Sequence, residues 1–128
     1  MQLIPAVDLQ DGECVRLFQG KQDQSTRYSD DPVGMAQHWV QEGAQRLHLV
    51  DLDGAFEEPA ENKDVIQSII ESVSVPCQVG GGLRSVQAVG HLLEAGADAA
   101  IVGTAGIKNP DLLGELVDRF GPESIIAG

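Results

Sequence analysis

Three short stretches of this 128-residue chain carry residue types that could transfer protons or bind an anion. The first is Asp8, which follows the apolar run 3–7. If that run is a strand of a parallel sheet, Asp8 lies at the strand end where such folds bind ligands, and its carboxylate can act as a general acid or base. The pattern Asp-x-x-Asp-Gly that begins at Asp8 is also common turn chemistry, so a loop-capping role is the alternative.

The second stretch is the triple glycine 80–82, which follows an apolar run and precedes Arg84 and Ser85. Glycines let backbone amides approach an anion closely, and a helix that begins at Ser85 adds unsatisfied donors. Arg84 adds a charge that can bind a phosphate with two hydrogen bonds. A tight turn with positive φ is the alternative, but three glycines exceed what one turn needs. We therefore predict a phosphate site at Gly81, Gly82 and Arg84.

The third stretch, Gly103-Thr104, follows the next apolar run and precedes a helix that begins near Pro110. A hydroxyl and exposed amides at the top of a neighbouring strand could bind the same phosphate, so this loop is predicted to face the triple glycine. Asp51 and Asp53 end another strand and are interpreted mainly as turn or structural residues. His48 is interpreted as a core histidine, and Cys14 has no partner base in the sequence.

These candidates are positioned by apolar runs that alternate with amphipathic helices. The predicted strands are 3–7, 47–50, 77–79, 99–102 and 124–127. Four helices follow the first four strands, and their predicted N-caps are Asp31, Asn62, Ser85 and Asn109, of which the first and last precede a proline. The order predicts a parallel sheet with right-handed crossovers, either an open doubly wound sheet or half of a (βα)8 barrel. The whole chain, 1–128, is predicted to be one domain.

Composition excludes several classes of function. The net charge of −12 and a pI near 4.3 argue against a nucleic acid partner, since such a chain repels a phosphate backbone. The sequence has no zinc-binding, Walker or dinucleotide motif, which predicts no metal and no such cofactor. No apolar run is long enough for a membrane span, and the N-terminus does not resemble a signal peptide. Two distant cysteines, Cys14 and Cys77, fit a reduced, cytoplasmic protein.

Several motifs in the same order resemble the isomerase family of histidine biosynthesis that acts on phosphoribosylformimino-5-aminoimidazole carboxamide ribotide. The resemblance covers 1–128, and the sister family, the cyclase subunit of imidazole glycerol phosphate synthase, typically has a cysteine where this chain has Ala6. The matching segments are 4–9, Gly12, 15–17, Gln19-Gly20, Tyr28 with Asp31-Pro32, 47–53, 79–85 and 102–105.

The resemblance implies an Amadori rearrangement of an aminoaldose to an aminoketose, without a cofactor. It implies that Asp8 is one of two catalytic aspartates and that the loops at 80–84 and 103–104 bind one of two substrate phosphates. Arg16 and Gly20 would belong to the substrate site, with Arg16 on a loop after the first strand that closes over the substrate. The family's second catalytic aspartate follows the fifth strand, so it is expected beyond Gly128.

Half of a barrel would leave two open sheet edges and an inner apolar face in water, which favours association. We therefore expect a homodimer about a twofold axis, with Asp8 facing its copy. Three functions stay open: an isomerase or a part of one, a half-barrel homodimer that binds phosphate compounds without turnover, and an open flavodoxin-like sheet that binds a phosphorylated ligand.

Overall fold

The computed structural model shows one seven-stranded sheet in the order β3-β2-β1-β4-β5-β6-β7. It describes residues 4–18, 21–29, 31–54, 56, 61–103 and 108–128. The strands are β1 (Ala6–Gln10), β2 (Glu13–Phe18), β3 (Lys21–Ser29), β4 (Leu47–Asp51), β5 (Cys77–Gly80), β6 (Ala99–Val102) and β7 (Ile125–Ala127). The helices are α1 (Pro32–Gln41), α2 (Glu61–Ser72), α3 (Val86–Glu94) and α5 (Pro110–Phe120).

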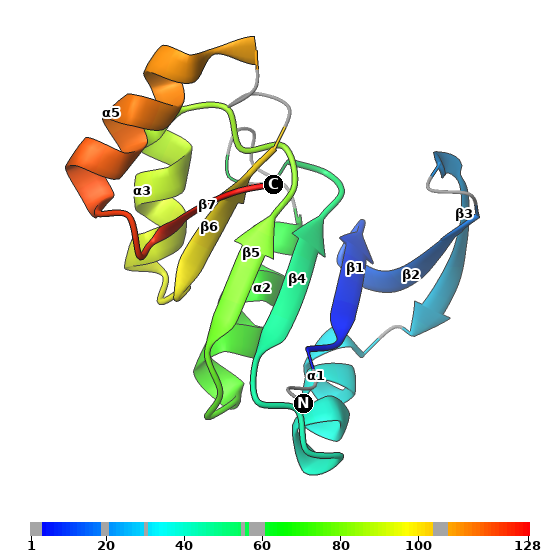
Figure 1. Cartoon of the computed structure of the whole chain (residues 1–128). Coiled ribbons are helices and arrows are strands. Elements are labelled where there is room, and N and C mark those ends of the chain that lie inside the picture. Colours follow the sequence, from blue (N-terminus) through cyan, green and yellow to red (C-terminus); the bar gives the residue numbers. More distant parts are fainter. Residues whose placement is uncertain (1–3, 19–20, 30, 55, 57–60, 104–107) are drawn as a thin grey trace.

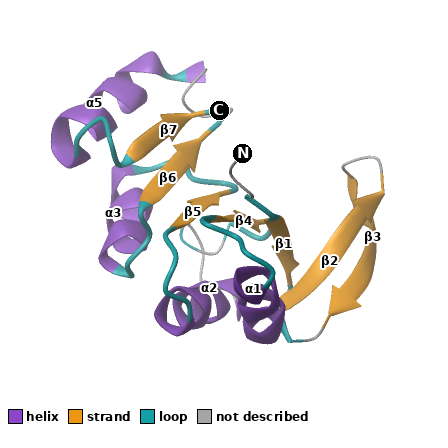
Figure 2. Ribbon diagram, turned by 60° about the horizontal axis from the view of Figure 1, so that its bottom comes forward, coloured by secondary structure: helices purple, strands orange, loops and turns teal. Residues whose placement is uncertain are grey.

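The predicted parallel α/β sheet is confirmed. Strands β1, β4, β5, β6 and β7 pair in parallel and in chain order, and the helices lie on one side of the curved sheet (Figures 1 and 2). A doubly wound sheet would reverse its strand order and carry helices on both faces, so the flavodoxin-like alternative is wrong. The arrangement is consistent with part of a (βα)8 barrel, in which helices cover only the outside.

Burial along the strands identifies the two faces of the sheet. Alternate side chains point to opposite faces, and the residues that face the helices are buried, such as Val7, Leu49 and Val79. The intervening residues face the concave side and include both apolar and polar side chains. The inner apolar face expected from the sequence is thus mixed in composition, because Asp8, His48 and Gln78 lie on it.

Three of the four predicted helix caps are confirmed. The side chains of Asp31, Ser85 and Asn109 accept hydrogen bonds from the backbone N–H groups of the first helical turn. Asn62 is not a cap: it lies inside α2, fully buried, and its side chain bonds to other elements. The Asn62 side chain thus bonds to residues far away in the sequence, and the local pattern of a helix cap does not indicate such contacts.

The largest difference from the prediction is the segment after the first strand. It forms the antiparallel hairpin β2–β3, which projects beyond β1 (Figure 1), rather than a loop. Asp11 and Gly12 link β1 to β2 with φ of 53° and 79°, as a two-residue turn of type I′ requires, and Asp-Gly favours that turn. Because β2 pairs with Asp8, Leu9 and Gln10, the first strand runs past Val7, and Asp8 lies within it.

The remaining strands lie within one residue of their predicted bounds, and β7 pairs with β6. Among the described residues, no helix is both long and apolar enough to cross a lipid bilayer. The large hydrophobic side chains that stay exposed in that part of the chain are Ile4 before β1 and Ile126 in β7, which are the two outermost parallel strands.

Candidate active site at the carboxyl ends of the strands

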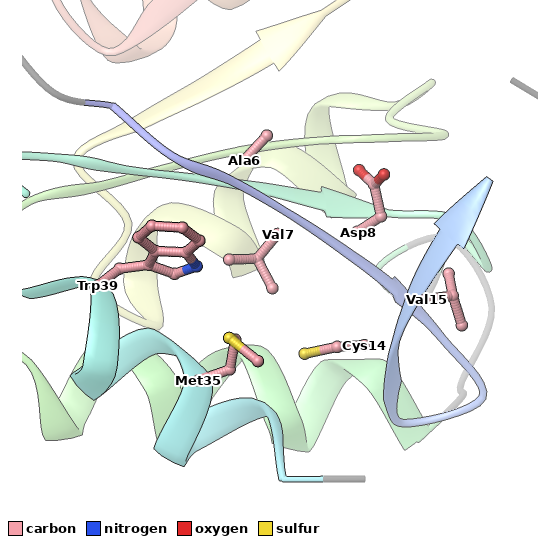
Figure 3. Close-up of a pocket in the computed structure, with 7 residues that line it drawn as sticks. All are labelled: Ala6, Val7, Asp8, Cys14, Val15, Met35 and Trp39. Carbon is pink, nitrogen blue, oxygen red and sulfur yellow. The ribbon is translucent and has the colours of Figure 1, made fainter. Parts of the chain in front are cut away.

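Asp8 lies on the concave face of β1, between Val50 of β4 and Val15 of β2. In Figure 3 its carboxylate points away from Met35 and Cys14, which lie on the helix side of the strand. Asp8 is half-buried, and this burial raises the pKa of its carboxyl, while the nearby His48 imidazole lowers the pKa. A half-buried carboxyl with a raised pKa at this position is suited to proton transfer.

The predicted phosphate-binding residues converge on one cavity. Gly81, Gly82 and Arg84 line it from the loop after β5, and Gly103 lines it from the end of β6. Its volume is about 490 Å³, and its other lining residues are Leu83, Ile101 and Lys108. The pairing of the two loops expected from the sequence is thus present in the structure.

Lys108 is a lining residue that the sequence reasoning missed. It is exposed just before Asn109, the N-cap of α5, and it lines the same cavity as Arg84. The available signal was a lysine on the loop after the fourth predicted strand, in a chain with only eight Lys and Arg residues against 20 Asp and Glu. Two cations at one cavity in such an acidic chain give this edge of the sheet a local preference for anions.

Packing also explains the triple glycine. Gly81 has φ of 110°, and a Cβ there would lie 2.1 Å from the Asp51 carbonyl oxygen. Gly82 has φ of 66°, and its Cβ would lie 3.0 Å from Cα of Gly54. Both positions therefore need glycine so that the loop can approach the end of β4, whether or not an anion binds. The same absence of side chains leaves the backbone at this edge accessible from the cavity.

Asp51 and Asn62 join the ends of β1, β4 and α2. Asn62 donates from Nδ2 to the Leu9 carbonyl at 2.9 Å and to Asp51 Oδ1 at 3.0 Å, and its Oδ1 accepts from the Gly12 N–H at 2.7 Å. Asp51 is 2% exposed and also accepts from the Asp53 N–H at 3.2 Å, while Asp53 accepts from the Asp11 N–H at 2.7 Å. These contacts show that Asp51 and Asp53 have the structural role that the sequence analysis favoured.

His48 differs from its prediction as a core residue. It is half-buried on the concave face, and its Nδ1 lies 3.2 Å from Gln78 Nε2. The apolar neighbours of His48 in the sequence suggested a core position, but they face the helices while His48 faces the opposite side.

Three predicted site residues are not tested by this geometry. Arg16 lies in β2, paired with Thr26 of β3, rather than on a loop. Gly20 and Thr104 lie outside the described residues. Within the part of the chain that the structure describes, no three His, Cys, Asp or Glu side chains converge as a metal site.

A second cavity, of about 200 Å³, lies between β1, β2 and α1 (Figure 3). Apolar side chains and the buried Cys14 form most of its lining, and Trp39 lies beside it on α1. Burial, with smaller contributions from Asp31 and Asp8, raises the Cys14 pKa to about 11. A thiol in that state is a poor nucleophile, which agrees with the absence of a partner base in the sequence.

Comparison with known proteins identifies the family. The model described as "Histidine biosynthesis protein" matches residues 2–128. A relative from Desulforudis audaxviator is 52% identical over 128 residues, covering 100% of this chain and 48% of the relative. One from Roseiflexus castenholzii is 50% identical over 127 residues, covering 99% and 54%. Both are 1-(5-phosphoribosyl)-5-((5-phosphoribosylamino)methylideneamino) imidazole-4-carboxamide isomerases. The chain thus spans about half the length of the curated relatives that it matches, and it belongs to the histidine biosynthesis protein family.

Proposed function

We propose that this chain contributes one phosphate-binding site and one catalytic aspartate to an aldose–ketose isomerase of histidine biosynthesis. The observation that carries the proposal is the cavity that joins Gly81, Gly82 and Gly103 to two cations, Arg84 and Lys108. It lies at the carboxyl ends of parallel strands, the edge where barrel enzymes bind their substrates. A phosphorylated substrate fits this local chemistry despite the acidic composition of the chain.

The substrate class follows from the relatives, whose names describe a compound with two phosphoribosyl groups. In our proposal the cavity holds one of the two phosphates, with Thr104 as a further donor. Bound there, the substrate extends along the concave face toward Asp8, which shares a register row with Val50, Gly80 and Ile101. Ile101 lines the cavity, so this row leads from the phosphate to the carboxyl.

Asp8 acts in this proposal as one of two acid–base groups of the rearrangement. An acid opens the ribose ring, and a base then removes the proton from C2, so a pair of carboxyl groups with complementary protonation states suffices without a cofactor. In our proposal the hairpin β2–β3, whose strand β2 contains Arg16 and pairs with β1, covers the bound substrate, and Gly20 belongs to the same site.

A second half-barrel would complete the site. We propose that a second copy of the chain can take that place in a cytoplasmic homodimer, because β7 ends the sheet with the exposed Ile126. If the dimer forms without turnover, the chain is a phosphate-binding homodimer, which is the alternative function. A stable monomer at micromolar concentration in sedimentation velocity would contradict the dimer.

The binding half of the proposal is tested by titrating the chain with ribose 5-phosphate. We expect the amide NMR signals of Gly81, Gly82 and Gly103 to shift together, and Arg84→Gln to weaken binding about 10-fold, as loss of one charged hydrogen bond predicts. Arg119→Gln removes the same charge from the exposed face of α5 and should leave the affinity unchanged.

Equal affinity of the Arg84→Gln variant and the unchanged chain would overturn this assignment of the phosphate site. So would binding that shifts amide signals elsewhere in the sheet and leaves the three glycines unaffected.

A further inference from the structure

The concave face of the sheet places a second polar pair beside Asp8. Because strand pairing aligns Ala6 with His48 and His48 with Gln78, these three residues form a row across β1, β4 and β5. Asp8 is two residues after Ala6 on the same face, so it lies diagonal to His48. His48 and Gln78 are half-buried, as Asp8 is, while their sequence neighbours face the helices.

The contact between His48 and Gln78 fixes the imidazole ring. Nδ1 lies 3.2 Å from Gln78 Nε2, and an amide nitrogen can only donate. When the neutral ring carries its proton on Nε2, Nδ1 accepts from this amide nitrogen. If the ring gains a second proton, rotation of the amide presents its oxygen to Nδ1 instead. Gln78 can therefore hold His48 in one orientation in either charge state.

We propose that His48, held by Gln78, is a positioning residue for Asp8 that keeps the Asp8 carboxylate ionised and available as a base. The role rests on the proposed function, because it concerns the same aspartate. It adds a histidine and a glutamine to the site, although neither reaches the phosphate cavity.

The charges around Asp8 support this choice of partner. Among the described residues of β4, His48 is the group that acts electrostatically on Asp8, and it lowers the pKa of a carboxyl that burial raises. Asp51, on the same strand, faces the helices and bonds to Asn62. On β2 the nearby titratable groups are the Cys14 thiol, on the helix side, and Glu13, which pairs with Gln10, while Asp31 precedes α1. Of these groups, His48 is the one that favours the charged form of Asp8.

The chemical consequence follows from the pH range in which a carboxyl titrates. An imidazole carries a positive charge in mildly acidic solution, where a buried carboxyl would otherwise take up a proton. A charged neighbour on the same face of the sheet opposes that uptake. The base form of Asp8 is then populated to lower pH than burial alone would permit.

The direct test is the carboxyl ¹³C titration of Asp8 in the chain, compared with its His48→Gln variant. We expect the midpoint to move to higher pH in His48→Gln, because the opposing charge is lost. His91→Gln makes the same exchange on the exposed face of α3 and should leave the Asp8 midpoint unchanged. An Asp8 midpoint that is the same in His48→Gln as in the unchanged chain would overturn the proposal.

His48→Lys separates charge from shape, since lysine restores a cation but cannot make the imidazole contact with Gln78. We expect His48→Lys to return the Asp8 midpoint toward lower pH. A midpoint as high as in His48→Gln would contradict the electrostatic role. If the aspartate responds in this way but the assembled protein shows no isomerase turnover, the inference stands and the proposed function fails. If turnover occurs, its acidic limb should shift to higher pH in His48→Gln.

Discussion

Gly81 is the residue at which the site depends most directly on the absence of a side chain. Its φ of 110° is a conformation that side chains oppose, and the Asp51 carbonyl oxygen occupies the place of a Cβ. The close approach connects the end of β4 to the loop that carries Arg84. Any displacement of this loop would therefore move the residues that we propose to bind phosphate relative to Asp8.

We predict that Gly81→Ala lowers the free energy of unfolding by about 3 kcal/mol or more, from backbone strain together with the contact at 2.1 Å. Gly114→Ala is the matched control, because Gly114 is exposed in α5 with nothing within 4 Å of its Cβ position. It should stabilise the chain by about 0.5–1 kcal/mol. Urea denaturation measures both changes, and a Gly81→Ala variant as stable as the unchanged chain would contradict the observed loop.

Some residues of the candidate site could be predicted from the sequence, and others could not. Gly81, Gly82, Arg84 and Gly103 could be grouped from sequence, because loops that follow adjacent parallel strands meet at one edge. Lys108 was missed, since a single lysine between a strand and a helix has many possible positions. The burial of Asp51 could not be foreseen either, because its partner Asn62 looks like an ordinary helix cap in the sequence.

The Asn62 amide joins helix α2 to the ends of strands β1 and β4. It satisfies the Leu9 carbonyl, the Asp51 carboxylate and the Gly12 N–H, all from a side chain with no exposed surface. Through Gly12 the same amide holds the turn from which the hairpin β2–β3 begins. The position of the hairpin relative to β1 therefore depends on a residue of α2.

We predict that Asn62→Ala lowers the free energy of unfolding by about 2–4 kcal/mol, because the Leu9 carbonyl, the Asp51 carboxylate and the Gly12 N–H each lose a hydrogen bond. Asn109→Ala serves as the control, since it removes an exposed helix cap and should cost about 1 kcal/mol. An equal loss of unfolding free energy in the two variants, measured by thermal or urea unfolding, would show that the Asn62 contacts stabilise the fold no more than a helix cap does.

Most helices and strands were predictable from the sequence, but the hairpin β2–β3 was not. The segment Lys21–Ser29 is mainly polar and has no alternating apolar face, so periodicity gives no strand signal. Its pairing with β2 fixes it as a strand. The Asp11-Gly12 pair was the usable signal, because both residues adopt the positive φ values of a hairpin turn.

The parallel strands pair in the order in which they occur in the chain, and this order brings the residues of the site together. It places the ends of β1, β4, β5 and β6 side by side, so that residues nearly a hundred positions apart in the sequence share one edge. Alternation of strands and helices predicted the sheet but not its order, since barrel and doubly wound folds share that alternation. The order and the single helix layer distinguish the two (Figure 2).

We propose that Asp8 is a catalytic group of an isomerase that needs a second half-barrel. The most direct measurement is isomerase turnover by this chain combined with the remaining half of the Desulforudis audaxviator relative, with which it shares 52% identity. We predict turnover that falls about 100-fold or more in Asp8→Asn, as expected for loss of an acid–base group. Asp64→Asn, on the exposed face of α2, should retain turnover. Turnover that is the same in Asp8→Asn as in the unchanged chain, or no turnover from the assembled halves, would contradict this role of Asp8.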